Sequence, residues 1–271
     1  MKLTYVPLLS LQLELQKMPR DMDRFKRYLG TLTSHDPRQQ AVVEYPPLGI
    51  ANPMAREHVT ELLEQLIAIK ADEIAASATA EAATALCNLP GECKLGLVLA
   101  DDLRGGWTNR FDYEYKLRFG SADAKFERDE NSPSGFRLPR WLKEFWLTSV
   151  LWSIEPVSEK AIRQAVLQTI YRFAYVIKHS PAHTLQQRLA QEGWVLAHSG
   201  GDGPTLDADD LAYTRQVLQP FLAETDKRTA IECLFGDDAA RSLGFTPRGL
   251  SPWAGIALAR HDALACHHAL E

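Results

Sequence analysis

The sequence lacks the patterns that would place it in a membrane or hold it together with disulfide bonds. None of its apolar runs reaches the ~18 residues that a membrane-spanning helix requires. Its four cysteines, Cys87, Cys93, Cys233 and Cys266, form no C-x-x-C pair and no disulfide framework. A bridge between Cys87 and Cys93 is the one pairing that local spacing allows, but free thiols in a reducing compartment are the simpler interpretation. We therefore expect a soluble, cytoplasmic protein without a membrane partner.

An excess of positive charge is also missing. The formal net charge is −5 and the isoelectric point is about 5.9, with the arginines scattered along the chain. Binding to nucleic acid requires a basic face that neutralises phosphates, so the composition argues against a nucleic-acid partner. The segment 18–29 mixes basic and aromatic residues, but Asp21 and Asp23 dilute its charge. Phe25 and Leu29 have the spacing of the buried side of a helix, which is the interpretation we favour.

Short motifs with known chemistry are absent as well. The chain contains no phosphate-binding loop, no dinucleotide fingerprint, no H-E-x-x-H, no G-x-S-x-G and no EF-hand loop. The glycine cluster at 199–204 lacks the lysine of a phosphate loop and indicates a turn. His261 and His268 lie ~10 Å apart along a helix, too far to chelate one ion. His58 and Glu61 have an i, i+3 spacing found in metal sites, but no second pair accompanies them. We predict no metal site, and the sequence identifies no cofactor.

What the sequence does contain is the composition of an ordinary globular protein. Its 271 residues are 45% hydrophobic and 24% charged, and this length is at the upper end of what one core supports. We therefore predict a single globular domain over residues 1–271. Helical patterns dominate, with expected starts at Asn52, Ser158, Thr184, Asp207 and Asp226. The helix after Ser158 has the clearest apolar face.

Strand patterns concentrate in the middle of the chain. Residues 94–100 form a short apolar run between a Pro-Gly turn and two aspartates, which is typical of a buried strand. Residues 145–153 are rich in β-branched and aromatic side chains, and residues 41–45 suggest a short edge strand. The fold is thus expected to be α+β (or mixed α/β), predominantly helical, with a small three- to four-stranded sheet in the middle of the chain.

One segment fits two structures. Residues 111–119 alternate strictly between apolar and charged side chains, which favours a half-buried strand. Phe111, Tyr115 and Phe119 in the same segment also have the i, i+4 spacing of a helix. We favour the strand here. The polar residues that follow, 121–135, predict a mobile loop.

The densest group of chemically active residues is 101–110, directly after the strand at 94–100. Ligands of open parallel sheets bind beyond the carboxyl ends of the strands, where loops converge. Two neighbouring carboxylates, Asp101 and Asp102, can divide acid and base roles because each disfavours ionisation of the other. Gly105 and Gly106 allow backbone amides to approach a ligand closely. These features predict a catalytic or binding loop.

Further residues complete this candidate site. Arg104 and Arg110 can clamp a phosphate or carboxylate, and Trp107 offers a flat stacking surface. Asn109 adds a polar side chain. Glu155 follows the strand at 145–153 and joins the same edge if that strand runs parallel to the first. The set predicts Asp101, Asp102 and Glu155 as catalytic residues, and Arg104, Trp107, Asn109 and Arg110 as residues that bind a small anionic ligand.

The sequence leaves the function open between three interpretations. A small-molecule binding protein or enzyme with an anionic ligand is favoured. A helical protein-interaction module without catalysis is the alternative, since the same aspartates can cap a turn and pair with the arginines. A metal-dependent hydrolase using Asp101 and Asp102 is a further alternative.

Overall fold

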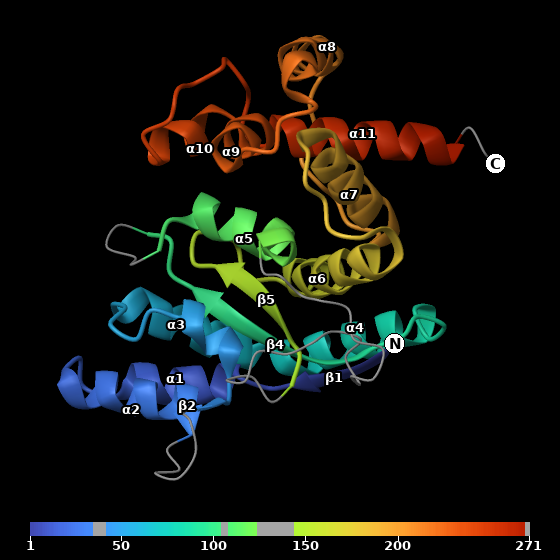
Figure 1. The fold of residues 1–271 in the computed structure, drawn as a ribbon. Coiled ribbons are helices and arrows are strands. Elements are labelled where there is room, and N and C mark those ends of the chain that lie inside the picture. Colours follow the sequence, from blue (N-terminus) through green and yellow to red (C-terminus); the bar gives the residue numbers. More distant parts are fainter. Residues whose placement is uncertain (35–41, 104–107, 124–143, 269–271) are drawn as a thin grey trace. The chain divides into compact units, whose positions relative to one another are not determined.

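The computed structural model describes residues 1–34, 42–103, 108–123 and 144–268 (Figure 1). In these ranges the chain forms eleven α-helices and a small three-stranded parallel sheet. The predicted class, a predominantly helical α+β fold, is therefore confirmed. Among the described helices, none combines the length and the apolar character that crossing a bilayer requires.

The backbone divides into two compact units. The first unit comprises residues 1–108 and 126–170, and the second comprises residues 109–125 and 171–271. The boundary at 170/171 falls inside one long helix, α6 (Glu159–His179), which begins where the sequence predicts. The predicted single domain stays a prediction, and the two units are described separately below.

A parallel sheet forms the centre of the first unit. Its order is β1 (Lys2–Val6), β4 (Glu92–Ala100) and β5 (Trp146–Trp152), with β4 in the middle. Strands β4 and β5 confirm the two main strand predictions. Gly96 lies on β4 where a Cβ atom would come within 2.6 Å of Leu8 Cδ1, so only a glycine lets that side chain sit against the strand without a shift.

Helices α3 (Glu57–Ala68) and α4 (Ala71–Ala85) bring buried apolar side chains to the first unit. Leu63 and Leu66 of α3, and Ala75 and Ala78 of α4, are each fully buried. The predicted strand at 41–45 is only partly formed: two of its residues pair with Thr33 and Ser34 in a separate antiparallel ladder. The remaining elements are α1 (Leu9–Lys17), α2 (Met22–Leu32), β2 (Thr33–Ser34), β3 (Val42–Val43), η1 (Pro46–Ile50), α3 (Glu57–Ala68) and α4 (Ala71–Ala85).

All regular secondary structure in the described residues of the second unit is helical. Three of its helices start at the predicted caps, where the side chains of Thr184, Asp207 and Asp226 each accept a hydrogen bond from the backbone N–H three residues later. The elements are α5 (Arg110–Asp123), the end of α6, α7 (Leu185–His198), α8 (Ala208–Leu218), η2 (Gln219–Phe221), α9 (Lys227–Phe235), α10 (Asp237–Ser242) and α11 (Ala254–His268).

The predicted strand at 111–119 is wrong, because this segment lies in helix α5. Tyr115 and Phe119, one turn apart, are 2% and 1% exposed and belong to the same core cluster as Leu234 and Phe235 of α9. A strand would place these two rings on the same face as Phe111 but farther apart, whereas a helix gathers them onto one core. The predicted loop at 121–135 lies outside the described residues beyond Asp123.

A cluster of buried charges joins α5, α6 and α7 within the second unit. The Glu192 carboxylate is fully buried and pairs with Arg118 and Arg172, and Glu114 pairs with Arg118. Burial opposes ionisation of Glu192, but the two guanidinium charges outweigh it and lower its pKa to about 2. The two glutamates balance the two arginines, so the cluster carries no net charge.

Candidate functional site at the carboxyl end of strand β4

Asp101, the first residue after β4, is buried at 4% exposure and surrounded by donors. Its Oδ1 accepts from His58 Nε2 at 3.0 Å and from Leu103 N at 3.3 Å, and Ser153 Oγ lies 3.3 Å away. Its Oδ2 accepts from Asn52 Nδ2 at 3.3 Å. Hydrogen bonds to both oxygens hold this carboxyl group in one orientation. Asp101 can therefore hold the side chains of Asn52 and His58 in place.

His58 is the neighbour that remains accessible. It is the second residue of α3, and its side chain is 28% exposed. With a carboxyl oxygen of Asp101 as the acceptor, we assign the ring proton to Nε2, which then donates to Asp101. Nδ1 then carries the lone pair, and it has no hydrogen-bond partner among the residues that the structure describes. An imidazole fixed in this way can accept a proton at Nδ1.

Asn52 links this site to the turn before α3. Its Nδ2 donates to Asp101, while its Oδ1 accepts from Met54 N at 3.0 Å. Gln16 Nε2 donates to the Asn52 carbonyl at 2.7 Å. The sequence predicted Asn52 as the start of a helix, but α3 begins only at Glu57, because the Asn52 side chain closes the turn and holds Asp101 instead.

Asp102 ties the end of β4 to the end of β5. Its backbone N–H donates to Ser153 Oγ at 3.1 Å, and its Oδ1 accepts from Ser153 Oγ at 2.9 Å and from Ile154 N at 3.1 Å. The two strands run parallel, with Ala100 opposite Trp152. The predicted common edge for Asp101, Asp102 and the residues after β5 is therefore present.

Glu155 lies three residues beyond β5, at this edge of the sheet. Its backbone N–H donates to the Trp152 carbonyl at 2.9 Å. The cavity that it lines with Trp152 and Ser158 has a volume of about 10 Å³, room for about one water molecule. Its predicted catalytic role stays a prediction.

The other predicted site residues are distributed differently. Arg104 and Trp107 lie outside the described residues. Asn109 and Arg110 belong to the second unit. Asn109 Oδ1 caps α5 by accepting from Phe111 N and Asp112 N, and the Arg110 guanidinium lies 5.6 Å from the centre of the Trp253 ring. These contacts give Asn109 and Arg110 structural roles, and their predicted ligand binding stays a prediction.

Sequence reasoning missed three residues of the site: Asn52, His58 and Ser153. His58 was considered only as a metal ligand with Glu61, and it meets Asp101 across 43 positions of the chain. No local spacing predicts that contact, because it follows from how α3 packs. Within the described residues, no group of three or more His, Cys, Asp and Glu side chains is arranged to hold a metal ion.

Comparisons with known protein families, with curated proteins and with solved structures find no match to this chain.

Proposed function

We propose that this protein is an enzyme that acts on a small anionic molecule, with His58 as the general base at the carboxyl end of β4. The observation that carries the proposal is the pair formed by the buried Asp101 carboxylate and the accessible His58 ring, 3.0 Å apart. A buried acid that orients a histidine is a common arrangement for proton transfer. Nδ1 of His58 would take the proton from the substrate or from an attacking water.

The roles predicted for the two aspartates change in this proposal. Asp101 is a positioning residue, because hydrogen bonds from Asn52, His58 and Leu103 already occupy both of its oxygens. Asp102 holds the ends of β4 and β5 together through Ser153 and Ile154. Proton transfer is assigned to His58, whose ring has both exposure and an available nitrogen. General base catalysis of this kind typically contributes about 10²–10⁴-fold to a rate.

The anionic character of the substrate is supported by the position of His58. It lies in the first turn of α3, and no side chain among the described residues caps the amino end of that helix. The backbone N–H groups of a first turn carry partial positive charge and favour an anion nearby. Arg104 is close to Asp101 in the sequence. We propose that its positive charge also attracts the anionic substrate.

The test begins with a ligand screen by thermal melting, using nucleotides, sugar phosphates and small carboxylates. A compound class that raises the melting temperature is then followed for turnover by NMR. We expect His58→Gln to keep the ligand-induced shift and to lose about 10²-fold or more in turnover. His261→Gln is the matched control, because that exposed histidine on α11 pairs with Asp262, away from Asp101 in the chain.

Three outcomes would count against the proposal. No shift with any class would favour the interaction module instead. Unchanged turnover in His58→Gln would show that His58 is not the general base, and a ligand that is bound but not turned over by the unmodified protein would leave a binding protein.

A further inference from the structure

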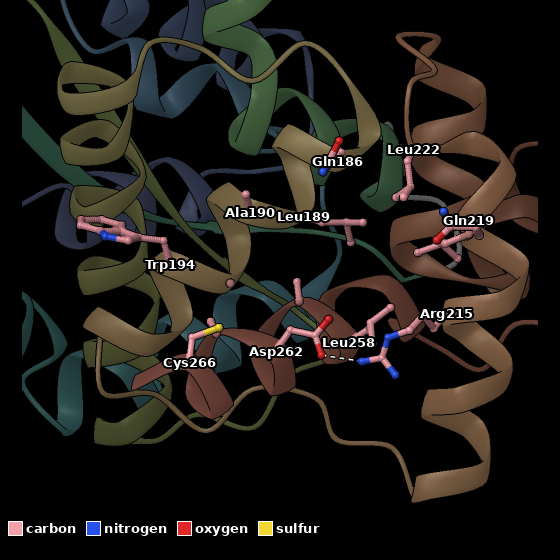
Figure 2. Close-up of a pocket in the computed structure, with 14 residues that line it drawn as sticks. Gln186, Leu189, Ala190, Trp194, Arg215, Gln219, Leu222, Leu258, Asp262 and Cys266 are labelled. Atoms are coloured by element: carbon pink, nitrogen blue, oxygen red, sulfur yellow. Dashed lines mark hydrogen bonds and ion pairs between the residues drawn. The ribbon is translucent and has the colours of Figure 1, made fainter. Parts of the chain in front are cut away.

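A second site lies entirely within the second unit. A pocket of about 550 Å³ opens between α7, α8 with η2, and α11 (Figure 2). Its base includes Leu218 and Leu258, which are 1% and 5% exposed, while Leu189 and Leu222 on its walls are partly exposed. This volume falls within the range of about 300–1,000 Å³ that is typical of small-molecule sites, and such sites are mainly apolar.

Close backbone packing fixes the floor of this pocket. A Cβ atom on Gly193 of α7 would lie 2.5 Å from the carbonyl oxygen of Ala259 and 3.2 Å from Cβ of Ala263, both on α11. Only glycine permits this approach, so α7 and α11 meet backbone to backbone under the pocket. The depression is therefore part of the helix packing itself and is present before a ligand arrives.

The pocket is elongated, with different side chains at its two ends. Figure 2 shows Trp194 and Cys266 toward one end, and Gln219, Leu222 and Arg215 toward the other. An elongated ligand with an apolar body would cover the leucines between these ends. Its polar group would then meet the amide of Gln219 and the guanidinium of Arg215.

Arg215 is suited to exchange its partner for a ligand. Its Nη2 donates to Asp262 Oδ1 at 2.6 Å, and both side chains are 51% exposed. Exposed ion pairs of this kind contribute little to stability, so separating Arg215 from Asp262 costs little free energy. His261 Nδ1 also contacts Asp262 Oδ1, at 3.1 Å, so Asp262 keeps a neighbour when Arg215 turns away.

We propose that this pocket binds an elongated apolar molecule that ends in a carboxylate, such as a medium-length acyl chain. The leucines and Trp194 would cover the chain, and Arg215 would pair with the carboxylate in place of Asp262. An arginine binds a carboxylate through two parallel hydrogen bonds, which a neutral or cationic head group cannot accept in the same way. The ligand site is independent of the proposed chemistry at His58.

Calorimetric titration of the full chain with dodecanoate, below its micelle concentration, tests the proposal. Dodecanol is the neutral probe of the same length. We expect dodecanoate to bind about tenfold or more tightly than dodecanol, because only the acid pairs with Arg215. Arg215→Gln should weaken dodecanoate binding by about the same factor and remove the preference.

A second variant tests the place of binding. Ala190 lines the pocket from an exposed position on α7, so Ala190→Phe fills the space without disturbing the core. We expect it to weaken binding of both probes by about tenfold or more. Ala212→Phe is the matched control, at an exposed position of α8 that does not line the pocket. Melting temperatures of all variants confirm that each is folded.

Three results would overturn the proposal. Absence of dodecanoate binding up to millimolar concentration removes the site. Equal weakening by Ala190→Phe and Ala212→Phe places binding elsewhere. Dodecanol binding as tight as that of dodecanoate refutes the assignment of a carboxylate ligand.

Discussion

Arg172 donates two hydrogen bonds to the Glu192 carboxylate, from Nε to Oε1 and from Nη2 to Oε2, each 2.9 Å long. Arg118 reaches the same carboxylate from α5. The buried glutamate of α7 thus links the neighbouring helix α6 with α5, which is distant in the sequence. A buried ion pair stabilises a fold only while both partners are present, because removal of one leaves the other charge without compensation.

Removing the Glu192 carboxylate alone is expected to destabilise the protein. Glu192→Gln leaves Arg118 and Arg172 as two buried cations with Glu114 as the remaining carboxylate of the cluster. We expect the free energy of unfolding to fall by about 3–5 kcal/mol. Urea denaturation measures this free energy. Arg215→Gln, which breaks an exposed ion pair, should cost no more than about 1 kcal/mol. A loss for Glu192→Gln as small as that of the control would show that the cluster is not structurally important.

The same glutamate predicts a dependence of stability on pH. Its pKa is lowered from 4.5 to about 2 in the folded protein. A group with a depressed folded pKa contributes stability that is present above its unfolded pKa and is lost as the pH falls toward the folded one. The wild-type protein should therefore lose roughly 3 kcal/mol between pH 4.5 and 2 through this group. Glu192→Gln should lack that part of the acid dependence, so the stability difference between the two proteins should narrow on acidification.

Asp101→Asn tests the role of Asp101 beside His58. The substitution keeps the size of the side chain but removes its negative charge. The amide oxygen is expected to stay toward His58 and Leu103 N, because Oδ1 meets more donors than Oδ2 does. The positive charge that His58 gains on taking a proton would then lack its counter-charge. We expect turnover to fall by about 10²–10⁴-fold with ligand binding largely kept. Turnover of Asp101→Asn equal to that of the unmodified protein would contradict the mechanism.

Gly193→Ala tests the packing under the second pocket. The new Cβ would lie 2.5 Å from a backbone oxygen of Ala259, an atom that cannot move aside without shifting α11. We expect a loss of stability of about 1–3 kcal/mol, since overpacking forces the backbone apart. Gly30→Ala in α2 is the control, because nothing lies within 4 Å of its added Cβ. That variant should be neutral or more stable by up to about 1 kcal/mol, and equal losses in both would count against close packing at Gly193.

The sequence predicted those parts of the fold that depend on local signals. Strands β4 and β5 are short apolar or β-branched runs bounded by turns, and the caps at Thr184, Asp207 and Asp226 are set by residues three positions apart. Helix α5 was predicted wrongly because its alternation fits a strand as well as its aromatic spacing fits a helix. The buried positions of Tyr115 and Phe119 in a distant core decide between the two, and no local rule contains that information.

Part of the geometry of the candidate site could also be predicted. Asp101 and Asp102 directly follow a buried strand, as the sequence indicates, and the parallel direction of β5 brings Ser153 to them. Their predicted catalytic role stays a prediction. His58 and Asn52 were not found, because they reach Asp101 through packing between segments more than 40 residues apart. Long-range contacts of this kind are set by the whole core.

Each unit is made of two separate stretches of chain, so its parts are synthesised at different times. Helix α5 leaves the ribosome before α7, α9 and α11, which supply most of the core around Tyr115 and Phe119. At about 5–20 residues per second, these two rings stay without their partners for several seconds. During that interval the nascent chain exposes an aromatic helix that only its last hundred or so residues can cover. The protein should therefore depend on chaperones that bind nascent apolar segments more than its modest size suggests.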